Sequence, residues 1–246
     1  MDTHAQLSNP NVVALNDLEG LLVDTEFPKR LAFLEVFREF YGLEMTVPEL
    51  AWTLGLQRQN VISGLTERFE SKPLMPDIAR DQSISIGEQI LRRRDEIVKA
   101  HFDSGIELMP GAELLIETCA LQNLASLVIT STAREVAMQM MRAAQIPDEF
   151  DAAVFGDTAG LLRGKPHPDP FLMGAARVGA APECCIVLGD SSADIFAARE
   201  AKMSSIYVPD RRIIAPNPEA VQAATYVVED LFQAAAIVQD EVRKRG

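Results

Sequence analysis

The stretch Val12-Val13-Ala14-Leu15-Asn16-Asp17-Leu18-Glu19-Gly20 joins an apolar run to two carboxylates and a glycine. A strand that is buried on both faces of a parallel sheet reads as a continuous apolar run, and ligands bind just beyond the carboxyl ends of such strands. We therefore expect Asp17 and Glu19 to lie at the ligand-binding edge of a parallel sheet.

Three further segments place hydroxyls, a lysine or carboxylates directly after an apolar run or before a predicted helix. They are Thr130-Ser131-Thr132 after residues 125–129, Gly164-Lys165-Pro166 before a helix, and Gly189–Asp194 after residues 186–188. The carboxyl ends of parallel strands share one edge, so these polar groups should meet in one crevice. Carboxylates, a lysine and hydroxyls together suit a divalent metal ion beside a phosphoryl group.

Strand and helix patterns alternate over the second half of the chain, which is typical of a parallel sheet covered by helices. The expected strands are 125–129, 152–155, 186–188, 205–208 and 224–228, and the expected helices are 110–123, 133–145, 168–179, 193–202 and 231–243. Residues 27–106 show helical patterns alone, at 27–41, 48–54, 61–69 and 84–102.

Composition limits the class of protein. A chain of 246 residues with 48% apolar residues can form one α/β domain and a small insert. A formal net charge of −13 disfavours nucleic acid and anionic membranes as partners, because both bind basic surfaces. No apolar run is long enough to span a membrane, and the N-terminus lacks the pattern of a signal peptide, so we expect a cytoplasmic enzyme.

The motifs also carry a family resemblance. Residues 16–26, Asn-Asp-Leu-Glu-Gly-Leu-Leu-Val-Asp-Thr-Glu, resemble the first motif of the haloacid dehalogenase superfamily, although Glu19 stands where the motif has its second aspartate. Residues 128–132, 164–171 and 189–194 resemble the second, third and fourth motifs. Residues 108–112 and 207–210 are similar to the branch that contains pseudouridine-5′-phosphatase, sugar-phosphate phosphatases and β-phosphoglucomutase.

The resemblance implies an α/β fold with a three-layer, Rossmann-like parallel-sheet core. Residues 1–26 and 107–246 would form this core, and residues 27–106 would form a small all-helical cap domain inserted after the first strand. The hinges of the cap would lie near residues 24–27 and 103–110.

The resemblance also implies a metal-assisted phosphoryl transfer. Asp17 would be the nucleophile that forms an aspartyl-phosphate. Mg²⁺ would be bound by Asp17, by Asp190 and by the backbone carbonyl of Glu19. Asp194 would belong to the same metal site and would orient a metal-bound water or Lys165.

The substrate phosphate would meet three other groups. The Thr130 hydroxyl and the Ser131 backbone amide would donate hydrogen bonds to it, and Lys165 would place a positive charge beside the transferring group. In the family the second aspartate acts as general acid and base, so Glu19 would take that role here.

The predicted cap offers one candidate for substrate selection. Gly55-Leu56-Gln57-Arg58 resembles a cap loop whose arginine binds the distal phosphate of a phosphosugar, which makes Arg58 a candidate substrate ligand. Successive helical residues point about 100° apart, so we expect Arg92-Arg93-Arg94 to form a solvated basic face. Lys29 stands where the mutase branch carries a histidine, which counts against a mutase.

Glu19 leaves three hypotheses open. Its extra methylene moves the carboxylate by about 1.5 Å relative to aspartate, and a misplacement of about 1 Å can cost roughly 100-fold in rate. The protein would be a Mg²⁺-dependent phosphatase of a small phosphorylated metabolite, such as a sugar phosphate or nucleoside monophosphate. Alternatively it would be a pseudoenzyme that binds Mg²⁺ and phosphometabolites, or a phosphosugar mutase or dehalogenase. We expect a monomer or weak dimer.

Overall fold

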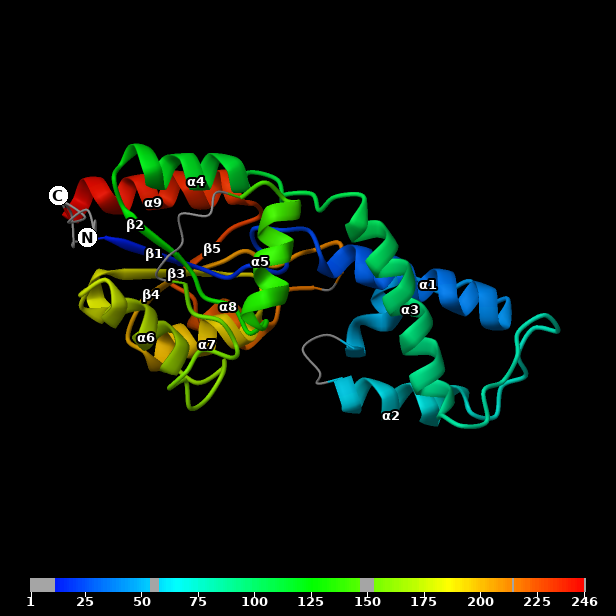
Figure 1. The fold of residues 1–246 in the computed structure, drawn as a ribbon. Coiled ribbons are helices and arrows are strands. Elements are labelled where there is room, and N and C mark those ends of the chain that lie inside the picture. Colours follow the sequence, from blue (N-terminus) through cyan, green and yellow to red (C-terminus); the bar gives the residue numbers. More distant parts are fainter. Residues whose placement is uncertain (1–11, 54–57, 147–152, 214, 246) are drawn as a thin grey trace. The chain divides into compact units, whose positions relative to one another are not determined.

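A computed structural model describes residues 12–53, 58–146, 153–213 and 215–245. Within these residues a five-stranded, fully parallel sheet has the strand order β2-β1-β3-β4-β5 (Figure 1). The strands are β1 (Val13–Asn16), β2 (Ala125–Val128), β3 (Cys185–Gly189), β4 (Ser204–Tyr207) and β5 (Tyr226–Val227).

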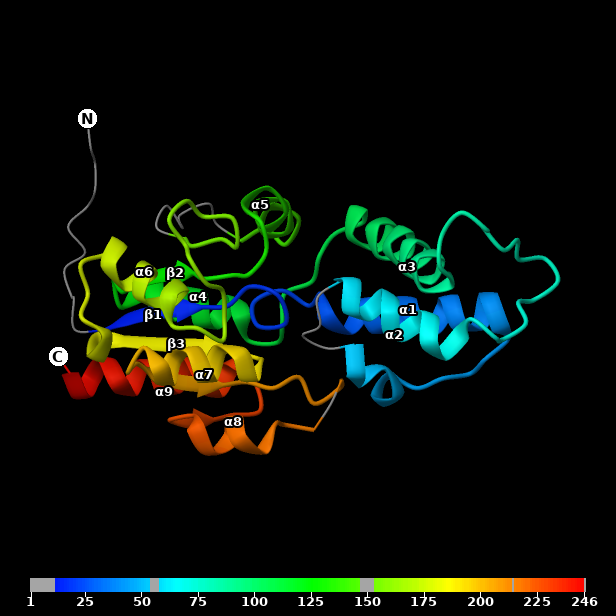
Figure 2. The same ribbon diagram turned by 90° about the horizontal axis from the view of Figure 1, so that it is seen from below.

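Helices cover both faces of the sheet. They are α4 (Ala112–Leu121), α5 (Arg134–Ala143), α6 (Asp169–Arg177), α7 (Ser192–Glu200), α8 (Pro218–Ala223) and α9 (Leu231–Arg245). Helices α4 and α9 pack together on one face, and α6 and α7 lie on the other (Figures 1 and 2). The predicted three-layer α/β core is therefore confirmed.

The strand register brings the strand ends together. β1 and β3 are buried along their whole length, as their unbroken apolar runs predict. Asn16 at the end of β1 is level with Val128 of β2 and with Leu188 of β3. The polar residues that follow these three positions must therefore emerge at the same edge.

The structure differs from the predicted core at two elements. Residue 152 of the expected strand 152–155 lies outside the described residues, and Val154 pairs with Ile129 through a single parallel bridge rather than within a strand. Helix α8 was not predicted, because it is only six residues long and its start depends on the Asn217 side chain, which accepts hydrogen bonds from two backbone amides.

A second, helical unit comprises residues Thr25–Ile106 together with Arg211–Ile214. It contains α1 (Glu26–Tyr41), the 3₁₀ helix η1 (Val47–Thr53), α2 (Arg58–Phe69) and α3 (Ile86–Asp103). Phe33, Phe37 and Phe69 stack in its core, with ring centroids 6.0 and 4.7 Å apart. The segment 211–214 was expected in the core domain, yet the Arg212 guanidinium lies 4.6 Å from the centre of the Phe27 ring.

The helical unit follows the first strand, as predicted, and the boundaries between the units fall at residues 24/25 and 106/107. That these positions act as hinges stays a prediction. Among the described helices, none has the length and apolar character required to cross a membrane.

Candidate active site

Backbone and side-chain hydrogen bonds hold Asp17 at the end of β1. Its backbone N–H donates to the Leu188 carbonyl oxygen at 2.9 Å. The buried Asn16 amide group donates to Ser126 Oγ at 3.0 Å and to the Leu127 carbonyl oxygen at 3.3 Å. The neighbouring strands therefore determine where Asp17 lies.

Lys165 lies between two of the predicted carboxylates. Its Nζ is 2.8 Å from Asp17 Oδ1, 2.6 Å from Asp194 Oδ1 and 2.7 Å from the Ile129 carbonyl oxygen. The lysine side chain is only 4% exposed. An ammonium group has three N–H donors, so these oxygens account for all of them.

The pKa values of this group reflect burial and charge together. Burial raises the pKa of the Asp17 carboxyl to about 7, against the lowering effect of Lys165, and the negative charge of Asp194 adds to the rise. Burial also disfavours the charged Lys165 ammonium, but Asp17 and Asp194 outweigh this effect and raise the lysine pKa above its ordinary value. The lysine therefore stays charged.

Asp194 is completely buried in the first turn of α7. The Ser191 N–H donates to Asp194 Oδ2 at 3.2 Å and the Asp194 N–H donates to Ser191 Oγ at 3.4 Å, which together form a capping box. The Ser191 hydroxyl also donates to Asp194 Oδ2, at 2.5 Å. A side chain at Gly189 would overlap the Asp194 side chain. The segment Gly189–Asp194 thus holds Asp194 beside Lys165.

The predicted metal-binding carboxylates come together. One carboxylate oxygen from each of Asp17, Asp190 and Asp194 lies within 4.8 Å of the other two. These are hard oxygen donors, and one lysine cannot neutralise three carboxylates, so the group fits a divalent metal ion. Gly20, at φ +81°, allows the loop after β1 to approach Asp190, because a Cβ there would overlap the Asp190 carboxylate. The Glu19 side chain lies outside this carboxylate group, and ligation by its backbone carbonyl stays a prediction.

Backbone contacts hold the loop that begins at Thr130. The Thr130 hydroxyl accepts a hydrogen bond from the Thr132 N–H at 3.1 Å, and its own N–H donates to the Val154 carbonyl oxygen at 2.9 Å. Thr130 is buried, whereas Ser131 is exposed. Their binding of phosphate stays a prediction.

Sequence reasoning missed the role of Thr132. Its hydroxyl donates a hydrogen bond to Glu19 Oε2. The sequence contained one signal for it, because Thr132 follows two residues already placed at the predicted site.

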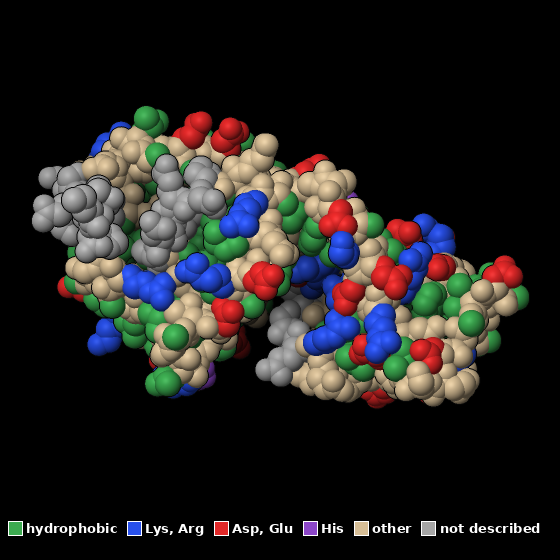
Figure 3. Space-filling model, in the orientation of Figure 1, with side chains coloured by type: hydrophobic (Ala, Val, Ile, Leu, Met, Phe, Trp, Pro, Cys, Tyr) green, Lys and Arg blue, Asp and Glu red, His purple; other side chains and the backbone are tan. Residues whose placement is uncertain are grey.

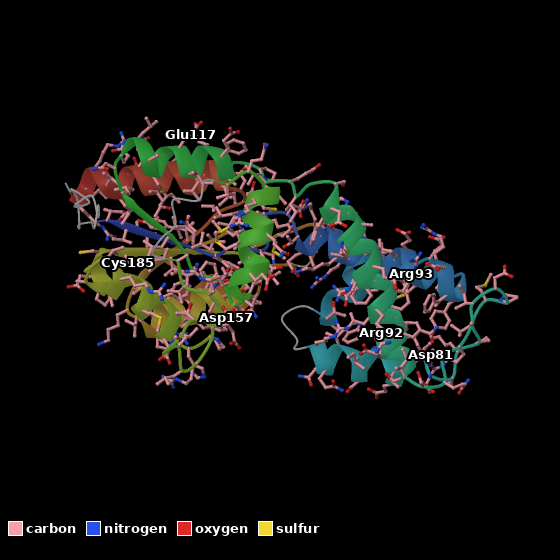
Figure 4. All side chains as sticks on the ribbon, viewed as in Figure 1. Asp81, Arg92, Arg93, Glu117, Asp157 and Cys185 are labelled. Atoms are coloured by element: carbon pink, nitrogen blue, oxygen red, sulfur yellow. The ribbon has the colours of Figure 1, made fainter. Side chains whose placement is uncertain are left out.

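Nearby, the Arg134 N–H at the start of α5 donates to Asp157 Oδ1 at 2.9 Å, and Asp157 is labelled beside α5 in Figure 4.

The structure places Arg58 in the helical unit, at the start of α2. Its guanidinium lies 2.6 Å from Asp95 Oδ2 and 3.5 Å from Glu88 Oε1, and both acids belong to α3. Its side chain is 52% exposed. Arg58 as a substrate ligand stays a prediction.

The arginine run on α3 divides into two kinds of environment. Arg92 and Arg93, labelled in Figure 4, form ion pairs on the surface of α3, where basic and acidic side chains intermingle (Figure 3). Arg94 is only 15% exposed, and its guanidinium lies 4.9 Å from the centre of the Phe33 ring. Burial lowers its pKa. The predicted solvated face is wrong for Arg94, because its direction from the helix axis takes it onto α1.

The chain is similar to known proteins over most of its length. The sequence profile of haloacid dehalogenase-like hydrolases matches residues 14–208. A probable pseudouridine-5′-phosphatase of Drosophila melanogaster is 29% identical over 87% of this chain and 87% of its own length. A phosphorylated carbohydrates phosphatase of Thermotoga maritima is 29% identical over 78% of this chain and 82% of its own length.

The fold is shared with solved structures. The crystal structure of a haloacid dehalogenase family hydrolase from Deinococcus radiodurans, with bound phosphate and sodium, has a TM-score of 0.77 at 20% identity. The match covers 95% of this chain and 97% of the Deinococcus radiodurans chain. The profile match spans well over half of the sequence and includes the Asp17, Lys165 and Asp194 positions. The chain therefore belongs to the haloacid dehalogenase-like hydrolase family.

Proposed function

We propose that the protein is a Mg²⁺-dependent phosphatase that acts on a small phosphorylated metabolite, such as a sugar phosphate or nucleoside monophosphate. The protein is a phosphoric monoester hydrolase, as its family and its phosphatase relatives indicate. The observation that carries the proposal is the buried Lys165 ammonium between Asp17 and Asp194, beside Asp190.

Phosphoryl transfer would proceed in two displacements. In the first, an Asp17 carboxylate oxygen forms a bond to phosphorus while the bond to the ester oxygen breaks, and Glu19 gives its proton to that leaving oxygen. In the second, a water oxygen attacks phosphorus and loses a proton to Glu19, while the bond to Asp17 breaks. Inorganic phosphate leaves, and Glu19 is protonated again for the next cycle.

The groups around Asp17 would stabilise the negative charge of the phosphoryl group and of the attacking carboxylate. Lys165 offers an ammonium beside the nucleophile, and the Thr130 hydroxyl and Ser131 amide would donate to the phosphoryl oxygens. Asp17, Asp190 and Asp194, with the carbonyl of Glu19, would hold Mg²⁺. When bound, this ion supplies the positive charge that lets an anionic nucleophile approach an anionic substrate.

One structural observation favours the phosphatase over the pseudoenzyme. Glu19 contacts Thr132, so the longer acid has a defined partner in the same loop that carries Thr130. Another observation counts against the mutase. Lys29 replaces the histidine of the mutase branch, and its Nζ lies 2.7 Å from Glu26 Oε1 in an ion pair. The net charge of −13 supports a small-molecule partner rather than nucleic acid or membrane. We further propose a cytoplasmic monomer or weak dimer.

A phosphate-release screen tests this function. The protein is assayed against a panel of phosphorylated metabolites with Mg²⁺ and with EDTA, beside Asp17→Asn as the matched control. We expect release of phosphate that requires Mg²⁺ and is abolished by Asp17→Asn, because that variant removes the attacking charge at nearly constant volume. Mg²⁺ binding without turnover of any substrate would instead support the pseudoenzyme.

A further inference from the structure

Glu19 reaches Thr132 because of its length. The Thr132 hydroxyl donates to Glu19 Oε2 across 113 positions of sequence. An aspartate carboxylate at position 19 would end about one C–C bond, roughly 1.5 Å, nearer the backbone. A hydroxyl–carboxylate hydrogen bond spans about 2.5–3.0 Å, so with this backbone aspartate would fall out of reach.

The Thr132 backbone is held at two points. The Thr132 N–H donates to Thr130 Oγ1 at 3.1 Å, and its carbonyl oxygen accepts from the Gly156 N–H at 2.9 Å. A Cβ at Gly156 would overlap the Ser131 carbonyl oxygen, so the two backbones are already in tight contact. Thr132 is therefore held at both its amide and its carbonyl.

The backbone of Glu19 is held from the other side. Glu19 forms a bridge with Val23, and the Gly20 N–H donates to the Val23 carbonyl oxygen at 2.9 Å. Gly20 in turn lies against Asp190. Because both backbones are constrained, the hydrogen bond between the two side chains holds one oxygen of the Glu19 carboxyl group beside Thr132.

We propose that Thr132 is a positioning residue that allows a glutamate to act as the general acid and base. This inference rests on the proposed phosphatase function. A hydroxyl both donates and accepts, so Thr132 can hold one Glu19 oxygen whether the carboxyl group is ionised or protonated. It would thus keep the group in place while Glu19 gives a proton to the leaving oxygen and later takes one from water. Thr132 itself takes no part in the proton transfer.

Leaving-group dependence separates this role from a structural one. Thr132→Val removes the hydroxyl at nearly constant volume, and Thr132→Ser keeps it. A displacement of about 1 Å costs roughly 100-fold, so we expect Thr132→Val to lower kcat/KM about 10–100-fold on glycerol phosphate. The loss of kcat/KM on p-nitrophenyl phosphate should be below about threefold, because its leaving group departs as an anion without protonation. The comparison uses kcat/KM because hydrolysis of the aspartyl-phosphate, in which Glu19 acts as the base, is common to both substrates and affects kcat alone. Thr132→Ser should restore the rate, and the remote Thr118→Val should have no effect.

A double-mutant cycle tests the pair directly. In the Glu19→Asp background, Thr132→Val should change the alkyl phosphate rate by less than about threefold, because the shorter acid has already lost the contact. The same cycle in melting temperature, measured without Mg²⁺ or substrate, reports the contact independently of turnover. We expect the two substitutions to be non-additive there as well.

The outcomes are distinguishable. Additive melting shifts would show that the contact is absent, and equal losses of kcat/KM on alkyl and aryl phosphates would show that Thr132 is merely structural. Either result overturns the positioning role while leaving an active parent enzyme as a phosphatase. A parent protein that hydrolyses no phosphate refutes the proposed function, and the positioning role with it.

Discussion

Replacing Lys165 with methionine should destabilise the protein strongly, in a way that depends on pH. The side chain is 4% exposed, and its Nζ lies within 2.8 Å of both Asp17 and Asp194. Removing one partner of a buried ion pair costs about 3–5 kcal/mol, because the other charge stays buried without compensation. In a domain protein of this size about 1 kcal/mol shifts the melting temperature by roughly 2–4 °C, so the expected loss is about 6–20 °C.

The pKa of Asp17 sets the pH dependence of this loss. Burial already raises that pKa to about 7 with Lys165 present, and removal of the lysine takes away an influence that lowers it. A carboxyl group whose pKa is raised on folding destabilises the folded protein as pH rises from its unfolded pKa to its folded pKa. Lys165→Met should therefore lower the free energy of unfolding by more at pH 8.5 than at pH 6, where Asp17 takes up a proton.

Thermal unfolding in EDTA at these two pH values measures the effect. Lys99→Met is the matched control, because the Lys99–Asp103 pair at 2.6 Å is 75% and 65% exposed. An exposed pair of this kind contributes about 0–1 kcal/mol. If Lys165→Met shifts the melting temperature no more than Lys99→Met, or shifts it more at pH 6 than at pH 8.5, the reasoning about this buried group is refuted.

Three further substitutions test other parts of the structure. A hydrogen bond from Lys244, with others from Tyr226 and Arg245, lowers the pKa of Glu241 to about 2. Glu241→Gln should therefore lower the melting temperature at pH 7, and the difference in melting temperature from the parent protein should fade as pH drops from 4.5 toward 2. A difference that stays constant with pH would contradict this. Arg94→Met should leave the melting temperature unchanged or raise it, since burial disfavours the charged guanidinium, and a large fall would show that the charge stabilises the helical unit. Gly156→Ala should lower the free energy of unfolding by about 1–3 kcal/mol, because the new Cβ overlaps the Ser131 carbonyl, and it should also slow phosphate release. Gly164→Ala is the control, because a Cβ there meets open space, and it should change neither the stability nor the rate in the same assays.

The sequence predicted the features that depend on strand pattern. Continuous apolar runs identified β1 and β3, and the rule that parallel strands share a carboxyl edge was sufficient to bring Asp17, Lys165 and Asp194 together. Asp194 was likewise expected in the same group of carboxylates as Asp17 and Asp190, and the structure places it there.

Contacts that depend on side-chain length and loop geometry were not predictable in this way. The hydrogen bond between Thr132 and Glu19 requires the path of two loops and the extra methylene of the acid. Arg94 is buried because of the direction in which α3 presents it to Phe33, and the arginine run by itself does not reveal that direction. The place of residues 211–214 in the helical unit depends on a return of the chain from the core, which no local pattern signals.

Chemical trapping of the aspartyl-phosphate tests the central claim most directly. The protein is mixed with the best substrate from the screen and Mg²⁺, quenched in acid, reduced with borohydride and analysed by peptide mass spectrometry. We expect Asp17 to be converted to homoserine in a substrate-dependent manner, with no other carboxylate modified. Steady turnover with an unmodified Asp17, or with the modification on another carboxylate, would contradict the mechanism proposed for this site.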